Sequence, residues 1–287
     1  GMAGAVAILR DTTTEQHAQR TLLETQQRLQ DANAELERMA HTDVLTGLAN
    51  RRLLLSRLEE EYARARRHGS SLALLMIDLD HFKQVNDTRG HLCVDRVLET
   101  IGSVPREAFV PEAVRALAYA DTALPLGHGE SMMKPVLEGR ALQALRPGAE
   151  ERVLEIGAGS GYLTACLARL AREVVAIELH ADLADAARAR LAAQGCGNAR
   201  VETADALAWD NDQHFDAICV SGAVHALPPR FVEWLKPGGR MFVVQGRSPA
   251  MQATLVHRDV NGLRTESLFE TDLPYLAGAA PQPEFTL

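Results

Sequence analysis

The stretch VLEIGAGSGY at residues 153–162 constrains the fold more than any other part of the chain. Its first four residues are mostly apolar, as in a buried parallel strand, and Gly157, Gly159 and Gly161 allow a sharp turn after them. The residues after the glycines have helical spacing, and a second apolar run follows the helix. Strand, glycine-rich turn, helix and strand in this order predict an α/β fold with a parallel sheet.

Three carboxylates stand near this turn or after the next two predicted strands. Glu155 precedes the glycines, Glu178 ends the second strand and Asp205 ends the third. Glycines let a ligand approach the backbone, and an acid at the next strand tip can accept both ribose hydroxyls. Asp205 can accept a hydrogen bond from an adenine amino group, and Glu155 can hold an ammonium. A dinucleotide site prefers the spacing G-x-G-x-x-G, so we expect S-adenosylmethionine rather than NAD.

The second half of the chain continues the alternation. FDAICVSGAV predicts a fourth strand, WLKPGGRMFVVQG a turn and a fifth strand, and QATLVHRDV with the segment around TESLFETDL a final pair. Upstream of the glycine turn lie VPREAFVP and AYADTALPLGHGESMMKP.

With these motifs, residues 95–287 resemble the class I S-adenosylmethionine-dependent methyltransferases, and among them the protein-L-isoaspartate O-methyltransferase family. The resemblance implies a Rossmann-like doubly wound sheet and methyl transfer by in-line displacement to a protein or peptide carboxylate. A carboxylate is already ionised at neutral pH, so the reaction needs no general base. The implied cofactor-binding residues are Glu155, Gly157, Ala158, Gly159, Ser160, Gly161, Tyr162, Glu178, Leu179, Asp205 and Ala206.

One loop departs from that family. Its members carry Gly-Gln-Thr-Ile-Ser-x-Pro, whose Ser helps to position the substrate carboxylate, whereas this chain has GESMMKP, with Met133 at the position of the Ser. Ser131 is the nearest hydroxyl, about 6–7 Å away along an extended segment, which is a large shift for catalysis. The substitution puts isoaspartyl repair in question. We take Ser131 as a candidate catalytic residue, and His225 as a second one because it follows the fourth strand.

Two other side chains have open interpretations. His128 lies between two glycines of the same loop, where it either contacts an anionic substrate or is a solvated loop residue. Trp209 either packs on the adenine or covers the edge of the sheet.

The segment before residue 95 has a different pattern. DVLTGLANRR, IDLDHFKQVND and the GH…D…VL string predict a helix over 50–67, a strand ending in Asp78 and Asp80, and a further helix. They resemble the N-terminal half of GGDEF-type diguanylate cyclases, which implies a metal ligand at Asp78 and guanine contacts at Asn86 and Asp95. The catalytic hairpin with its Gly-Gly-Asp/Glu-Glu-Phe signature does not occur in the sequence, so we expect no cyclase activity. Read as part of the following domain, Asp95 is instead a helix N-cap.

Residues 18–39 carry apolar or small side chains at alternating three- and four-residue steps between polar ones. This heptad seam predicts a coiled coil and hence a homodimer, although one amphipathic helix packed on its own domain would give a similar pattern. The run AVAILRDTTTEQ before it resembles the last strand of a PAS sensor domain. The predicted organisation is a PAS tail and signalling helix at 1–40, a partial α/β cyclase fragment at 41–94 and the methyltransferase-like domain at 95–287.

Bulk properties exclude several classes of function. The formal net charge of −8 argues against a sequence-independent nucleic-acid binder. No apolar run is long enough for a transmembrane helix, and four scattered cysteines without a C-x-x-C pair indicate free thiols in a cytoplasmic protein and no metal site. Two alternatives to an active methyltransferase stay open: a non-catalytic, dimerising interaction protein with a ligand-binding methyltransferase fold, and an artificial fusion.

Overall fold

The computed structural model describes residue 26 and residues 51–68, 92–260 and 262–282. The chain divides into two compact units, Gly1–Leu72 and Ala73–Leu287. In the first unit, helix α2 (Arg51–His68) is the helix predicted over 50–67. The coiled-coil segment apart from residue 26, the PAS tail, and the cyclase-type residues Asp78, Asp80 and Asn86 lie outside the described residues. Among the helices that the structure describes, none is both long and apolar enough to cross a membrane.

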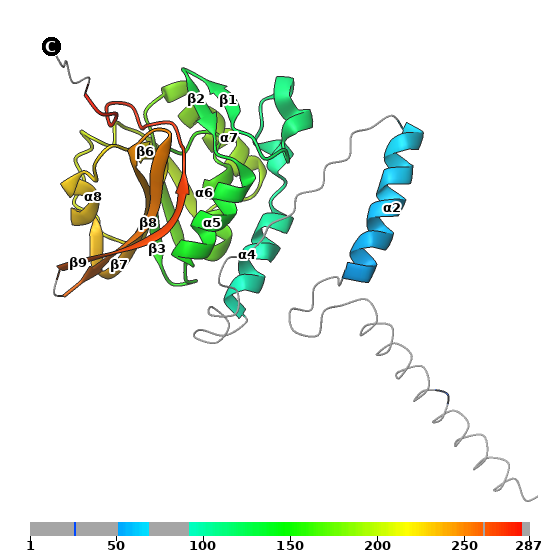
Figure 1. Ribbon diagram of the computed structural model, residues 1–287, viewed down its shortest axis with the longest axis horizontal. Helices are drawn as coiled ribbons and strands as arrows, with labels where there is room; N and C mark the ends of the chain where they lie inside the picture. The colour runs from blue at the N-terminus through cyan, green and yellow to red at the C-terminus, as the bar shows by residue number, and fades with distance from the viewer. Residues whose placement is uncertain (1–25, 27–50, 69–91, 261, 283–287) are drawn as a thin grey trace, which may run out of the picture. The chain divides into compact units, whose positions relative to one another are not determined.

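The second unit is built around a seven-stranded sheet with a small hairpin beside it (Figure 1). Its helices are α4 (Leu92–Ser103), α5 (Pro135–Leu145), α6 (Tyr162–Leu170), α7 (Ala181–Ala193) and α8 (Pro229–Glu233), with two 3-10 turns, Arg106–Ala108 and Glu112–Leu117. The hairpin consists of β1 (Leu124–Gly127) and β2 (Glu130–Met132). The sheet contains β3 (Arg152–Ile156), β4 (Glu173–Glu178), β5 (Ala199–Thr203), β6 (Phe215–Val224), β7 (Leu235–Arg247), β8 (Ala250–Asp259) and β9 (Gly262–Thr271). Every strand predicted from the glycine turn onward is present.

The strand order is β5-β4-β3-β6-β7-β8-β9. Strands β3 to β7 are parallel to one another, whereas β8 runs antiparallel to both β7 and β9. The chain moves outward from β3 through β4 to β5, and then returns to place β6 on the other side of β3. This reversal is the switch point of a doubly wound sheet, where a crevice opens at the carboxyl ends of the strands. The Rossmann-like fold is confirmed, and the glycine turn after β3 lies at that crevice.

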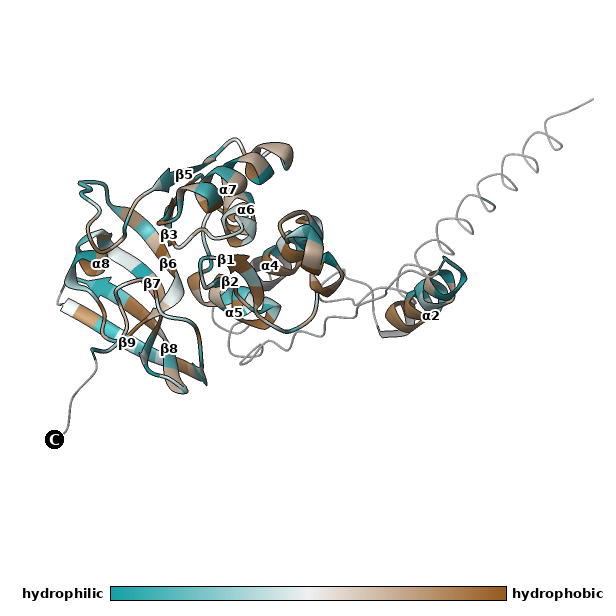
Figure 2. Cartoon of the chain, turned by 90° about the horizontal axis from the view of Figure 1, so that it is seen from above, coloured by the Kyte–Doolittle hydropathy of each residue, from teal (hydrophilic) through white to brown (hydrophobic). Residues whose placement is uncertain are grey.

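Two apolar layers cover the faces of the sheet. On one face, α4, α5, α6 and α7 bury a large cluster that includes Leu142, Cys166 and Cys219. On the other face, α8 and neighbouring loops bury a smaller cluster around Phe231 and Trp234. Figure 2 shows α8 on the opposite side of the strands from α6 and α7. Because both faces are covered, the central strands read as continuous apolar runs.

Helix α4 corrects one prediction. Asp95 is its fourth residue and not its N-cap, because the helix already begins at Leu92. The nearest residue that strongly disfavours helix is Gly90, so the intervening sequence does not stop the helix from starting before Asp95.

Candidate active site: a cleft at the switch point of the sheet

The turn between β3 and α6 needs its glycines. Gly157, Gly159 and Gly161 have φ angles of 91°, 52° and 86°, in the left-handed region that other residues avoid. The backbone N–H groups of Gly157 and Ala158 donate to the carbonyl oxygen of Ile177 on β4, at 2.9 and 3.0 Å. This pairing holds the turn at the carboxyl end of the sheet.

Glu178 at the end of β4 is buried beside the turn. Its carboxylate accepts hydrogen bonds from the backbone N–H of Gly159 at 2.8 Å and of His180 at 3.1 Å. Asp205 lies just after β5, the strand next to β4 in the sheet. It is exposed, and its carboxylate accepts a hydrogen bond from the N–H of Leu207 at 2.8 Å. The two carboxylates therefore face one crevice from adjacent strand tips, in fixed orientations.

A cleft with about 730 Å³ of empty space opens there. The walls combine the glycine turn, the strand tips, the β1–β2 hairpin and a segment near the C-terminus: Leu126, Glu130, Ser131, Ile156, Gly157, Gly159, Ile177, Glu178, Leu179, His180, Ala204, Asp205, Ala206, Leu207, Ser221, Gly222, Leu273, Pro274, Tyr275, Leu276 and Ala277.

The segment from Leu273 to Ala277 forms one wall of this cleft. Pairing with Ala223 at the end of β6 fixes it, since Ala223 donates to the carbonyl of Pro274 and accepts from the N–H of Leu276, both at 2.8 Å. A Cβ at Gly222 would lie 2.6 Å from Cδ2 of Leu276, so any larger residue there would force the Leu276 side chain to move.

A second cavity of about 280 Å³ adjoins this cleft and shares Leu126, Ser131, Gly157, Gly159 and Ser221 with it. We call it the inner cavity. Its remaining lining residues are Met132, Met133, Glu138, Glu155, Ala158, Ser160 and Leu163.

Glu155 faces the inner cavity from β3. Its carboxylate accepts hydrogen bonds from the hydroxyls of Thr164 at 2.5 Å and Ser221 at 3.2 Å. Burial raises the pKa of Glu155 to about 8, and the hydroxyl groups only partly oppose this effect. A carboxyl with this pKa favours a ligand that brings a positive charge.

Glu138, on α5, was not among the predicted site residues. It forms a buried ion pair with Arg106, whose Nε donates to Oε2 at 2.9 Å and whose Nη2 donates to Oε1 at 3.2 Å. Arg106 also donates to the carbonyl oxygens of Met133 at 2.6 Å and Ala118 at 2.5 Å. These bonds tie the loop after β2 to α5 and to the segment before β1. The partners are 32 residues apart, without a spacing motif that would have identified them.

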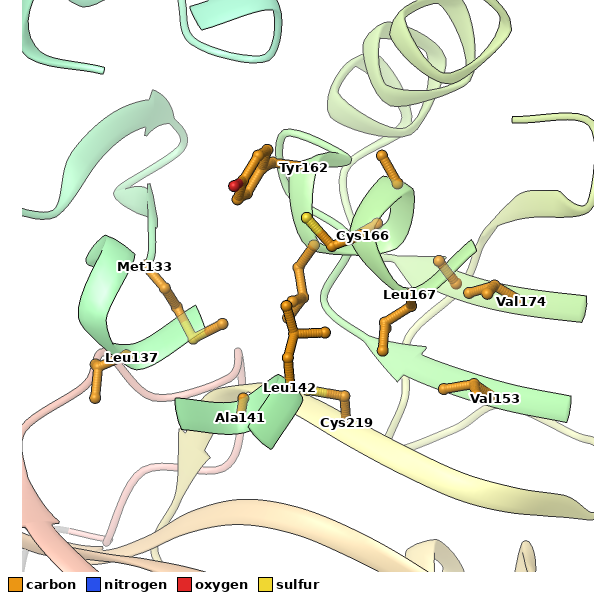
Figure 3. Close-up of a cluster of buried hydrophobic side chains, with 14 of the residues drawn as sticks. Met133, Leu137, Ala141, Leu142, Val153, Tyr162, Cys166, Leu167, Val174 and Cys219 are labelled. Carbon is orange, nitrogen blue, oxygen red and sulfur yellow. The ribbon is translucent and has the colours of Figure 1, made fainter. Parts of the chain in front are cut away.

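The β1–β2 hairpin carries the candidate acceptor-side residues. Ser131 lines both the cleft and the inner cavity. Met133 is 6% exposed and belongs to the same buried cluster as Leu142 and Cys166, as Figure 3 shows. The side chain at 133 thus fills apolar space in this cluster.

His128 at the hairpin turn is neither in the cleft lining nor a simple solvated residue. Its Nε2 lies 2.9 and 3.0 Å from the carboxylate oxygens of Asp182, which lowers the pKa of Asp182. Its ring stacks on that of His180, with centroids 4.1 Å apart. His128 therefore links the hairpin to the start of α7 beside the cleft.

The structure places most of the predicted cofactor residues on the two cavities. Nine line one or both of them: Glu155, Gly157, Ala158, Gly159, Ser160, Glu178, Leu179, Asp205 and Ala206. The other two do not. Gly161 packs against Ala187 at the start of α6, and the buried Tyr162 ring is directed into the core, 5.7 Å from the Phe109 ring.

Two further candidates lie outside both linings. His225 is exposed, and its backbone N–H donates to the carbonyl of Ala279 at 2.8 Å. Trp209 packs edge-on against Trp234, with ring centroids 5.1 Å apart, so it covers the apolar layer under α8. Of the two open interpretations for Trp209, the geometry supports the structural one.

Comparison with known proteins places this site in a family. The family model described as Protein-L-isoaspartate(D-aspartate) O-methyltransferase matches residues 80–271. The chain belongs to this family. Protein-L-isoaspartate O-methyltransferase 2 of Syntrophobacter fumaroxidans is 36% identical over 74% of this chain and 87% of its own length. Protein-L-isoaspartate O-methyltransferase 1 of Rhodopseudomonas palustris is 40% identical over 65% of this chain and 80% of its own.

A solved structure supports the fold. The Plasmodium falciparum putative protein-L-isoaspartate O-methyltransferase, in complex with S-adenosyl-L-homocysteine, aligns with a TM-score of 0.57 at 20% identity, over 69% of this chain and 99% of that one. A second family model, Diguanylate cyclase, GGDEF domain, matches residues 40–114. The chain is therefore a methyltransferase of the isoaspartate family that carries a fragment of a GGDEF domain.

S-adenosylmethionine is the cofactor of this methyltransferase, and the residues present fit it. Glu178 and Asp205 offer carboxylate oxygens for ribose hydroxyls and for the adenine amino group. The inner cavity adds buried acids for an ammonium. On the sheet side, the glycine turn and Ser221 of β6 line both cavities, so a ligand can extend past them from one cavity into the other.

Proposed function

We propose that this methyltransferase esterifies a carboxylate of a protein or peptide, with Ser131 as the hydroxyl on the acceptor side. The position of Ser131 carries the proposal, because this residue lines both the cleft and the inner cavity, where the two meet. The curated relatives are named for action on L-isoaspartate, so an isoaspartyl peptide is the first acceptor to test.

Bound S-adenosylmethionine supplies an electrophilic methyl group on a sulfonium. The protein then needs to hold the acceptor oxygen in line with the bond that breaks, which can account for much of the rate. The Arg106 bond to the carbonyl of Met133 fixes the loop after Ser131, and the hairpin holds Ser131 itself by pairing with Pro125. An ionised carboxylate needs no base, which agrees with the position of His225 outside both cavities. We therefore assign no catalytic role to His225.

The test is transfer of labelled methyl to an isoaspartyl peptide, with the same peptide containing normal Asp as the acceptor control. We expect transfer by the wild type and at least a tenfold loss of kcat/KM in Ser131→Ala, since positioning errors of about 1 Å cost about a hundredfold. Ser103→Ala is the matched control, because Ser103 ends α4 outside both cavities. Transfer that is unaffected by Ser131→Ala would contradict the role of this hydroxyl.

The burial of Met133 favours a second candidate function, ligand binding without turnover on isoaspartyl acceptors. In that case wild-type transfer is absent and Met133→Ser restores it. Transfer by the wild type would exclude this candidate.

We also propose that residues 18–39 dimerise the protein as a coiled coil, within the organisation of 1–40, 41–94 and 95–287 given above. Light scattering on the whole chain should then give twice the monomer mass of 31.2 kDa. Free, buried thiols at Cys166, Cys196 and Cys219 support a cytoplasmic location for the reaction.

A further inference from the structure

The inner cavity has acidic walls without a cation. Glu155 and Glu138 line it and are 1% and 3% exposed. None of its lining residues, all in the described part of the chain, is Lys, Arg or His. Buried carboxylates are costly unless a positive charge compensates them.

The nearest guanidinium compensates only one of the two carboxylates. Arg106 gives two hydrogen bonds to Glu138, and its other bonds go to the carbonyl oxygens of Ala118 and Met133. Within the described part of the chain, the side-chain hydrogen-bond partners of Glu155 are the hydroxyls of Thr164 and Ser221. When both carboxylates are ionised, Arg106 neutralises that of Glu138, and the charge of Glu155 has no cationic partner among the residues that line the cavity.

The surroundings do not supply that charge. Burial raises the pKa of Glu138 to about 7, against the effect of Arg106, and raises the pKa of Glu155 to about 8. The nearby Tyr162 and Cys166 have pKa values raised well above neutrality by burial, so both are uncharged. Glu178 adds only further negative potential at Glu155. Glu155, with its pKa raised to about 8, therefore holds its proton at neutral pH until a cation enters.

S-adenosylmethionine carries an α-ammonium group on its amino-acid part, and this group can compensate a buried carboxylate. Glu178 and Asp205 direct the adenosine part to the main cleft, so the amino-acid part reaches the inner cavity. Its carboxylate can accept hydrogen bonds from the hydroxyls of Ser131 and Ser160, which line the same cavity. Its α-ammonium then faces the acids.

We propose that Glu138 binds the α-ammonium of S-adenosylmethionine together with Glu155, and that Arg106 is a positioning residue that orients Glu138. This adds a cofactor-binding residue from α5 to those on the strand tips and the glycine turn. The inference concerns the cofactor alone and holds for any acceptor.

Calorimetry with two ligands tests it without turnover. The first is S-adenosylhomocysteine, and the second is 5′-S-(3-carboxypropyl)-5′-thioadenosine, which has hydrogen in place of the amino group. The ratio of their Kd values measures the contribution of the ammonium and is independent of the fraction of folded protein. We expect Glu138→Gln to reduce the wild-type preference for S-adenosylhomocysteine about 10–100-fold, as for a lost hydrogen bond to a charged group.

Glu151→Gln is the matched control, because Glu151 pairs with Arg240 away from both cavities. This control should keep the wild-type preference. An unchanged preference in Glu138→Gln would overturn the proposal, whatever the acceptor assays show.

A measurement on the wild type keeps the proposal testable if Glu138→Gln does not fold. At pH 7, in buffers of different ionisation enthalpy, S-adenosylhomocysteine should release more protons on binding than the deamino ligand, because its ammonium ionises Glu155. Equal proton release for the two ligands would overturn the proposal.

Discussion

Replacing Arg106 with Met tests how the acceptor loop is anchored. Arg106 is 1% exposed and joins three segments through Glu138, Met133 and Ala118. Met fills a similar part of the space but donates no hydrogen bond. The variant therefore leaves one buried carboxyl and two carbonyl groups without their donor.

The expected loss of stability follows from these groups. Removing one partner of a buried ion pair costs about 3–5 kcal/mol, and each orphaned carbonyl costs about 1–3 kcal/mol when it finds no water. The terms are not additive, so we take about 4 kcal/mol as the expected loss for Arg106→Met. For a unit of this size, each kcal/mol lowers Tm by about 2–4 °C, which gives a decrease of roughly 8–16 °C.

The loss should depend on pH. Without Arg106, the cause that lowers the pKa of Glu138 is gone, so this pKa rises beyond about 7. A carboxyl whose folded-state pKa is raised stabilises the fold at pH values below its unfolded pKa, and this contribution is lost as pH rises through the folded pKa. The Tm difference between Arg106→Met and wild type should therefore be larger at pH 8 than at pH 5. Adding Glu138→Leu removes the orphaned carboxyl and should recover about half of the loss, independently of pH.

Thermal unfolding of the three proteins at both pH values, monitored by circular dichroism, measures these differences. A decrease of less than about 3 °C in Arg106→Met, equal at pH 5 and pH 8, would refute the reasoning. It would mean that the ion pair contributes little to holding α5 and the loop together.

Three further predictions follow from single sites. Gly161→Ala should lower Tm by roughly 2–8 °C in thermal unfolding. A non-glycine residue at a φ of 86° loses about 1–2 kcal/mol of stability, and its Cβ would lie 3.2 Å from that of Ala187. An unchanged Tm would contradict the expected backbone strain at this position. Glu178→Gln should weaken S-adenosylhomocysteine binding at least tenfold by calorimetry, as expected for the predicted contact of this carboxylate with the ribose hydroxyls, and unchanged affinity would exclude this contact. Cys166 and Cys219 should resist thiol reagents in the native protein and react in denaturant, because burial raises the pKa of both thiols; fast native labelling would contradict their burial.

Local patterns predicted the parts of the molecule that depend on nearby residues. The glycine turn forms as expected because the positive φ angles of Gly157, Gly159 and Gly161 are a property of those residues alone. Glu178 and Asp205 meet in one cleft because parallel neighbouring strands bring their carboxyl ends to the same edge. In both cases the fold class was enough to place the side chains.

Contacts between distant segments could not be predicted in this way. A buried Arg in VPREAFVP has no local signal for its partner Glu138 on α5, because the pairing depends on how two helical segments pack. The wall formed by Leu276 depends on its pairing with Ala223, more than 50 residues earlier. The direction of the Tyr162 ring could not be predicted for the same reason: the glycine turn suggested a cofactor contact, and α6 directs the ring into the core.

Helix α4 shows how the two family resemblances in this chain can be separated. Residues 80–114 are matched by both the GGDEF and the methyltransferase models, so sequence similarity alone assigns them twice. The helix packs on α5 and α6, with Val97 4% exposed in the core cluster and Nη2 of Arg96 3.0 Å from the carbonyl of Leu170. Removing α4 from its position against α5 and α6 would expose Val97 and break the hydrogen bond between Arg96 and the carbonyl of Leu170. A cyclase-type domain upstream therefore cannot use α4 without destabilising the methyltransferase. This favours the assignment of α4 to the methyltransferase domain.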